Sequence, residues 1–180
     1  MVAFLLRRIT MKSRLEEIAK KGTCERLKVG ALVTLGNDIV AVGYNTSPPN
    51  TKTCLEVSCE VVGGHCVRTI HAEVMAISKF LELAHLYNES AYTRVPNSLK
   101  SLATLYVTHE PCYQCAKFIA LSGIKQIKYL YPYRSDQRVI DIYEANDIVC
   151  EQLSLYELLP APEELANEVD VELLEKQVYG

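Results

Sequence analysis

The sequence contains no apolar run long enough to cross a membrane. The run at Met1–Leu6 ends at Arg7 and Arg8, whereas a membrane-spanning helix needs about 20 apolar residues. The same run lacks the order of a signal peptide, in which basic residues precede the apolar ones. We therefore expect no membrane partner and a cytoplasmic location, which for a viral chain is the cytosol of the host.

The chain also lacks the excess of positive charge that is typical of nucleic-acid-binding proteins. Its 19 Lys and Arg residues and 22 Asp and Glu residues give a net charge of −3 at pH 7. Eight of the basic residues lie in the first 28 positions, and residues 157–180 carry seven acids and one Lys. We expect no nucleic-acid partner.

No internal repeat divides the chain. A length of 180 residues with 49% hydrophobic residues is most simply one domain with a full core. We assign residues 1–156 to this single domain and residues 157–180 to an acidic C-terminal tail.

Helical and strand patterns alternate along the predicted domain. The patterns predict helices over residues 12–21, 71–83, 112–122 and 136–145, and strands over 29–34, 39–42, 102–108, 126–131 and 148–153. The polar stretches 44–70 and 88–99 are predicted to be loops. This alternation predicts an α/β sheet with helices on its faces.

The cysteine count is odd, at seven. A cytoplasmic chain favours cysteine thiolates as metal ligands over disulfides. Two of the cysteines form the string Pro111-Cys112-Tyr113-Gln114-Cys115, and a second string, His71-Ala72-Glu73, precedes it. Together these strings supply one imidazole, two thiols and one carboxylate.

The two strings predict a catalytic zinc site. His71, Cys112 and Cys115 would leave the fourth tetrahedral position to water, whereas structural zinc sites are closed by four protein ligands. Zinc lowers the pKa of its water toward neutrality, and Glu73 would carry the protons of that water. The alternative interpretation is a structural zinc knuckle in which Glu73 is only a solvated helix residue.

Three segments resemble the deoxycytidylate (dCMP) deaminases. They are residues 43–49 (GYNTSPP), 64–73 (GHCVRTIHAE) and 105–112 (LYVTHEPC). The order H-x-E followed by P-C-x-x-C is the signature of zinc nucleobase deaminases. The resemblance covers about residues 11–150, and one departure is Thr46, where family members have Gly.

The resemblance implies a cytidine-deaminase-like three-layer fold, with a central mixed sheet flanked by helices. It implies hydrolysis of dCMP to dUMP and ammonia, which supplies dUMP for thymidylate synthesis. It further implies activation by dCTP with Mg²⁺, inhibition by dTTP and a homo-hexamer. Two alternatives stay open: a bifunctional dCMP/dCTP deaminase, and a zinc-stabilised, non-catalytic nucleotide-binding or regulatory protein.

The resemblance also implies substrate contacts. Asn45 would bind the sugar or the pyrimidine edge, the backbone of Ala72 the exocyclic groups, and Tyr133 the face of the ring. A phosphate needs cations, for which the sequence offers Arg26 and Lys28, with Arg68 and Arg134 as further candidates. The predicted effector-responsive residues are Gly43, Tyr44 and Asn45.

Relatives can carry a second, structural zinc built from cysteines and a histidine. We expect Cys24, Cys54 and His65 to be its ligands here, with Cys59 or Cys66 as the fourth. The alternative interpretation is a set of small buried cysteines beside a surface histidine.

Overall fold

The computed structural model describes residues 10–86, 97–134 and 136–154. Its main sheet has five strands in the order β2-β1-β5-β6-β7. They are β1 (Gly30–Leu35), β2 (Asp38–Tyr44), β5 (Ala103–His109), β6 (Gln126–Tyr131) and β7 (Val149–Gln152). β1 runs antiparallel to β2 and β5, whereas β5, β6 and β7 are parallel, so the sheet is mixed.

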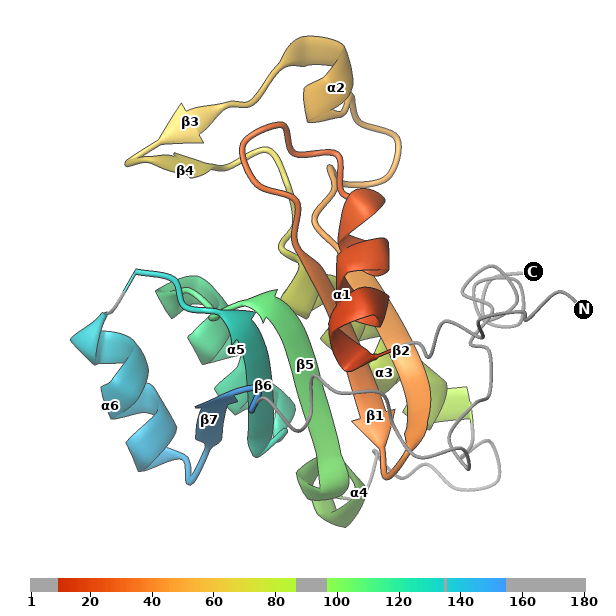
Figure 1. Cartoon of the computed structure of the whole chain (residues 1–180), viewed down its shortest axis with the longest axis vertical. Coiled ribbons are helices and arrows are strands. Elements are labelled where there is room, and N and C mark those ends of the chain that lie inside the picture. The colour runs from red at the N-terminus through yellow and green to blue at the C-terminus, as the bar shows by residue number, and fades with distance from the viewer. Residues whose placement is uncertain (1–9, 87–96, 135, 155–180) are drawn as a thin grey trace, which may run out of the picture.

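Helices cover both faces of this sheet (Figure 1). α1 (Met11–Lys20) packs on one face, and α3 (Ala72–Leu86) and α5 (Tyr113–Ser122) pack on the other, with α6 (Gln137–Ala145) beside α5. The predicted three-layer arrangement is confirmed. None of the helices in the described ranges is long and apolar enough to cross a membrane.

Alternation along β1 divides the core between these layers. Ala31 and Val33 belong to the cluster under α3 and α5, whereas Leu32 belongs to the cluster under α1. Successive strand residues point to opposite faces, and all three side chains are fully buried. β1 is therefore buried on both of its faces.

A glycine brings the start of α3 directly onto β2. A Cβ atom at Gly43 would lie 2.3 Å from the carbonyl oxygen of Ala72 and 2.5 Å from the backbone nitrogen of Ala76. Only a residue without a side chain permits this approach. The close contact places residues 71–73 beside the carboxyl end of β2.

The predicted loop over 44–70 is wrong in part, because it contains short elements. They are α2 (Cys54–Val57), β3 (Val61–Val62) and β4 (His65–Cys66), and Figure 1 shows them projecting from the sheet. We call residues 54–66 the arm. Gly63 and Gly64 both have positive φ, which suits a two-residue hairpin turn, but the strands are too short to show a period.

Most other boundaries agree with the prediction to within one or two residues, and the largest differences lie around residues 84–102. α3 extends to Leu86, and α4 (Asn97–Leu102) begins inside the predicted loop over 88–99. The acidic tail over 157–180 lies outside the described residues.

Candidate active site

The starts of two helices meet beside the sheet. The carbonyl of His71 accepts a hydrogen bond from the backbone of Met75, and the carbonyl of Cys112 accepts one from Ala116. His71 therefore precedes the first turn of α3, and Cys112 is the N-cap of α5. The positive end of a helix favours thiolates, so this junction suits sulfur ligands.

The imidazole and the two sulfurs point toward one another. Nδ1 of His71 lies 3.2 Å from Sγ of Cys115 and 3.6 Å from Sγ of Cys112. Donors bound tetrahedrally to zinc at ~2.0–2.3 Å stand about 3.5–3.8 Å apart. The three residues therefore fit zinc with little rearrangement.

Hydrogen bonds among His71, Cys112 and Cys115 shift the pKa values of all three side chains. The hydrogen bond with Cys115 lowers the pKa of Cys112 to about 3, and the one with Cys112 raises the pKa of His71 to about 9. The hydrogen bond to Cys112 and burial raise the pKa of Cys115. The lowered pKa of Cys112 favours its thiolate, and a metal ion would take the place of protons on these groups.

Glu73 is a buried acid next to these ligands. It lies in the first turn of α3, its exposed fraction is 4%, and burial raises the pKa of its carboxyl group. A carboxyl group with a raised pKa can both accept and donate a proton near neutral pH. The position therefore supplies a general acid–base group.

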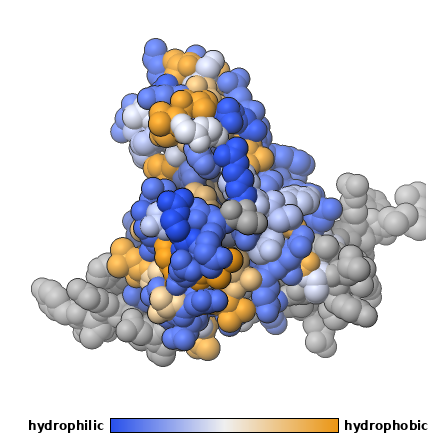
Figure 2. Space-filling model, turned by 90° about the vertical axis from the view of Figure 1, so that its left-hand side faces the viewer, coloured by the Kyte–Doolittle hydropathy of each residue, from blue (hydrophilic) through white to orange (hydrophobic). Residues whose placement is uncertain are grey.

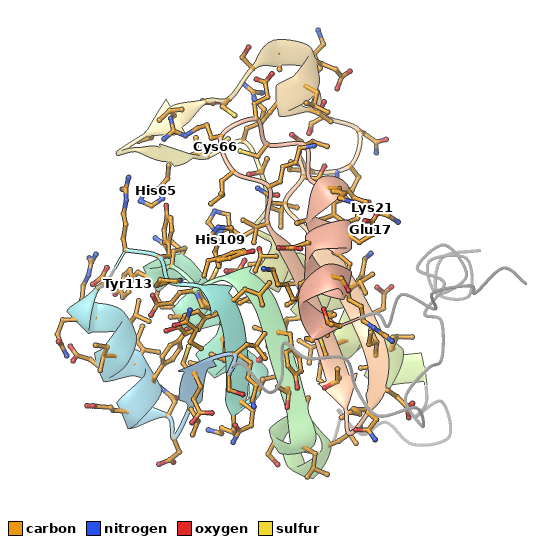
Figure 3. All side chains as sticks on the ribbon, viewed as in Figure 1. Glu17, Lys21, His65, Cys66, His109 and Tyr113 are labelled. Atoms are coloured by element: carbon orange, nitrogen blue, oxygen red, sulfur yellow. The ribbon has the colours of Figure 1, made fainter. Side chains whose placement is uncertain are left out.

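His71, Glu73 and Cys112 line the floor of an open cavity of about 280 Å³, and Cys115 is not part of this lining. Four of the residues predicted to bind the substrate also line it, namely Arg26, Asn45, Ala72 and Tyr133. Figure 3 shows His65 and His109 facing the space between the arm and the sheet. The cavity thus joins the predicted metal ligands to the predicted substrate residues.

Asn45 also holds one wall of the cavity in place. Its Oδ1 accepts from the backbone of Val29 at 2.9 Å, and its Nδ2 donates to the carbonyl of Leu27 at 2.7 Å. Leu27 and Val29 both line the cavity. Two of the hydrogen bonds of this buried amide thus go to the chain, and the second N–H of Nδ2 is left for a ligand.

Comparison with known proteins agrees with the geometry. Residues 7–131 match the family described as the cytidine and deoxycytidylate deaminase zinc-binding region. This chain belongs to that deaminase family.

Individual relatives support the assignment. The deaminase is 34% identical over 142 residues to ComE operon protein 2 of Bacillus subtilis, covering 79% of this chain and 68% of the relative. It is 33% identical over 116 residues to the deoxycytidylate deaminase of Mycobacterium phage D29, covering 62% and 84%. A crystal structure of dCMP deaminase from cyanophage S-TIM5 with dCMP and dUMP matches with a TM-score of 0.57 at 28% identity, over 78% and 91% of the chains.

One predicted phosphate ligand of the deaminase does not reach the cavity. Lys28 is exposed, and its Nζ donates to the carbonyl of Lys20. It lies between Leu27 and Val29, which face the cavity, so its side chain takes the opposite direction. Arg26 lines the cavity instead.

Of the three residues predicted to respond to effectors, one lines the cavity and two are packed inside the protein. Gly43 is packed under α3, and Tyr44 packs against the core cluster under α1. Asn45 lines the cavity. Effector binding by Gly43 and Tyr44 stays a prediction.

Glu110 also belongs to the cavity, although no sequence motif pointed to it. Its Oε2 accepts a hydrogen bond from the backbone of Tyr133 at 3.2 Å, and its side chain lines the cavity. The position follows the carboxyl end of β5, where ligands of α/β sheets commonly bind. Its place just after a predicted strand is the sequence feature that could have indicated Glu110 as a site residue.

The second predicted cluster forms without its histidine. The sulfurs of Cys24, Cys54, Cys59 and Cys66 lie within 4.8 Å of one another. His65 precedes Cys66 in β4, and neighbouring strand residues point to opposite sides. The His65 ring therefore turns to Tyr133, with 6.4 Å between ring centroids. The structure thus brings the four cysteines together without the predicted His65.

Proposed function

We propose that this protein is a zinc-dependent dCMP deaminase that hydrolyses dCMP to dUMP and ammonia. The observation that carries the proposal is the buried carboxyl group of Glu73 beside a His-Cys-Cys ligand set, at the floor of a cavity with arginines at its mouth. The phage relatives named as dCMP deaminases support the choice of substrate.

The reaction would use the metal ligands and the carboxyl group of Glu73, which transfers the protons. Zinc held by His71, Cys112 and Cys115 would supply a water of lowered pKa. Glu73 takes a proton from the attacking water and returns protons to N3 and to the leaving amine, so that dCMP and water give dUMP and ammonia. The backbone of Ala72 and the amide of Asn45 orient the nucleotide, with Tyr133 against the ring.

Two arginines at the mouth of the cavity suit the 5′-phosphate. Nη2 of Arg26 lies 3.2 Å from the carbonyl oxygen of Gly64. A Cβ at Gly64 would be 3.4 Å from Nη1 of Arg134, so both guanidinium groups approach one glycine. A guanidinium group binds phosphate in a forked geometry, and a monophosphate would lie between the two.

The decisive experiment is an ammonia-release assay across dCMP, dCTP, CMP, deoxycytidine and cytosine. We expect the highest kcat/KM for dCMP. Equal turnover of dCTP would replace the proposal with the bifunctional enzyme. No turnover by protein with full zinc content would favour the non-catalytic nucleotide-binding protein.

The family resemblance of residues 43–49 supports a further part of the proposal. dCTP with Mg²⁺ activates the enzyme, dTTP inhibits it, and the active form is a homo-hexamer. The dUMP formed feeds thymidylate synthesis in the cytoplasm.

A further inference from the structure

The turn that follows β6 forms one wall of the cavity. Its residues 132–134 include Tyr133 and Arg134, which both line the cavity. Figure 1 shows this turn below the β3–β4 hairpin of the arm, and Figure 2 views the same side of the molecule and shows mostly hydrophilic surface beneath the arm. None of residues 132–134 belongs to either core cluster of the described chain. Packing in the hydrophobic core therefore does not fix the turn.

Glu110 binds this turn at the end of the β5–β6 pairing. The last paired residues of the two strands are His109 and Tyr131, and the backbone N–H of Glu110 donates to the carbonyl of Tyr131 at 3.0 Å. In a regular parallel ladder the next bond would run from the N–H of Tyr133 to the main-chain carbonyl of Glu110. Here that N–H donates instead to Oε2 of the Glu110 side chain at 3.2 Å. The side chain thus replaces its own carbonyl as the acceptor.

This hydrogen bond holds the first available donor of the turn. Pro132 has no N–H, so Tyr133 carries the first N–H after the strand. A backbone N–H that is half-buried and loses its acceptor costs free energy. Without the carboxylate, the turn would have to move until the N–H of Tyr133 found another acceptor or water.

The side chain of Tyr133 contacts other groups at the mouth of the cavity. Its ring lies edge-on to the His65 ring, with 6.4 Å between centroids, and the guanidinium carbon of Arg134 lies 5.9 Å from its centroid, within the range of a cation–π contact. Arg134 in turn approaches Gly64 of the arm. The backbone position of Tyr133 therefore sets both the ring that would lie against the pyrimidine and the guanidinium group that would bind the phosphate.

The charge of Glu110 does not explain its place at this cavity. Like charges repel, so a carboxylate that lines a cavity for a nucleotide phosphate would weaken binding if it acted through its charge alone. As a hydrogen-bond acceptor it has a defined partner, the N–H of Tyr133. The two roles predict different effects when the charge is removed and the acceptor oxygen is kept.

We propose that Glu110 is a positioning residue whose side chain holds the backbone of Tyr133, and thereby sets Tyr133 and Arg134 for substrate binding. The nature of that substrate rests on the proposed dCMP deaminase function. The hydrogen bond itself does not depend on the substrate and is tested separately below.

Steady-state kinetics of the full-length, zinc-loaded protein test the role. Glu110→Ala should raise KM for dCMP about tenfold or more, the size expected for loss of a charged hydrogen bond, with little change in kcat, because Glu73 and the metal ligands stay in place. Glu110→Gln keeps an acceptor oxygen, so its KM should stay at or below the wild-type value. The control Glu151→Ala removes an exposed acid of β7 and should change neither constant.

Two kinetic outcomes would overturn the proposal. One is an equal rise of KM in Glu110→Ala and Glu110→Gln, which would assign the effect to charge. The other is a wild-type KM in Glu110→Ala. If Glu110→Ala does not fold, Glu110→Met takes its place, because methionine fills a similar volume without an acceptor oxygen.

A mutant cycle tests whether Glu110 acts through the turn. In the background Tyr133→Ala/Arg134→Gln, adding Glu110→Ala should change kcat/KM for dCMP little further, because residues that act through one another are not additive. A further loss as large as in the wild-type background would show an independent effect and contradict the proposal.

Hydrogen exchange at the Tyr133 amide tests the contact whatever the substrate is. The amide should exchange slowly in the wild type and in Glu110→Gln, and faster in Glu110→Ala at a temperature where thermal melts show all three proteins folded. Unchanged exchange in Glu110→Ala would overturn the proposal. A wild type that does not turn over dCMP would instead refute the proposed function, and the exchange result would still decide the role of Glu110.

Discussion

At the scale of single residues, burial distinguishes Glu73 from the other acids in the part of the chain that the structure describes. Its side chain is enclosed at the floor of the cavity, and burial raises its pKa. Most exposed acids are solvated and stay ionised at neutral pH. A Glu in the same motif on an exposed helix would keep its ordinary pKa and would be less suited to transfer protons near neutral pH.

Glu73→Gln should keep the fold and the zinc content but lower kcat by roughly 10²–10⁴-fold or more, because an amide cannot transfer the protons. The measurement is dCMP turnover on protein whose zinc content equals that of the wild type. Activity near that of the wild type would exclude the acid–base role.

The raised pKa of Glu73 also predicts a pH dependence of stability in the zinc-free protein. Below about pH 4.3, the ordinary pKa of Glu, the carboxyl group is protonated in both the folded and unfolded states. Above it the unfolded state ionises first, so stability falls as pH rises toward the folded pKa. Zinc-free Glu73→Gln should therefore melt above the zinc-free wild type at pH 8, and this difference should shrink toward pH 4. A constant difference would contradict the assignment.

Arg26 and Lys28 are two nearby cations of which only Arg26 lines the cavity, so substitutions at the two positions can be compared. Arg26→Gln should raise KM for dCMP about tenfold or more and leave deoxycytidine turnover unchanged, because Arg26 lines the cavity. Lys28→Gln removes the same charge two residues away, where the side chain faces outward, and should leave both substrates unaffected. Equal effects of the two variants would indicate a general charge effect.

At the scale of elements, the contact between β2 and α3 positions the site. His71 and Glu73 reach the cavity because α3 starts on the backbone of β2 at Gly43. Cys112 reaches it, and Cys115 meets His71, because α5 packs beside α3. The distance between the ligand pairs is thus set by packing of helices on one face of the sheet.

Gly43→Ala should destabilise the protein by about 1–3 kcal/mol, the usual cost of forcing a methyl group into a packed core, because the added Cβ would overlap backbone atoms of Ala72 and Ala76. Zinc affinity should fall as well, since α3 carries a ligand at its start. The control is Gly36→Asn, at a position with positive φ and open space, where Asn tolerates the left-handed conformation. Thermal melts and zinc titration compare the two, and equal stability losses would contradict the packing argument.

At the scale of the whole molecule, the arm and the three-layer body together line the cavity. The body supplies the acid and the catalytic ligands, and the arm supplies the wall that carries Gly64 and His65. A site built from two parts permits control, because a ligand that binds one relative position better shifts the population toward it.

Regulation should appear as sigmoidal saturation by dCMP, a more hyperbolic curve with dCTP and Mg²⁺, and inhibition by dTTP. Couplings of this kind are typically about 1–3 kcal/mol, or roughly 5–150-fold in affinity. Light scattering establishes the oligomer in the same buffer, and Asn45→Ala should weaken both substrate binding and the effector response. Hyperbolic kinetics in a confirmed hexamer, unchanged by either triphosphate, would indicate an unregulated enzyme.

The sequence by itself determined the chemistry and the alternation of elements. Cys112 and Cys115 are three residues apart, so local helix geometry is enough to predict that these two share a metal ion. His71 was predicted as the third ligand from the order of the H-x-E and P-C-x-x-C strings. The apolar periods of strands and helices are equally local, and they predicted the sheet and its layers.

Only the tertiary structure decided which distant groups meet. Whether Cys66 or His65 joins Cys24 depends on which face of a two-residue strand points inward, and whether Arg26 or Lys28 reaches the cavity depends on the direction of one side chain. Such choices are set by packing between segments far apart in the chain, where a shift of one residue reverses the face that a side chain occupies.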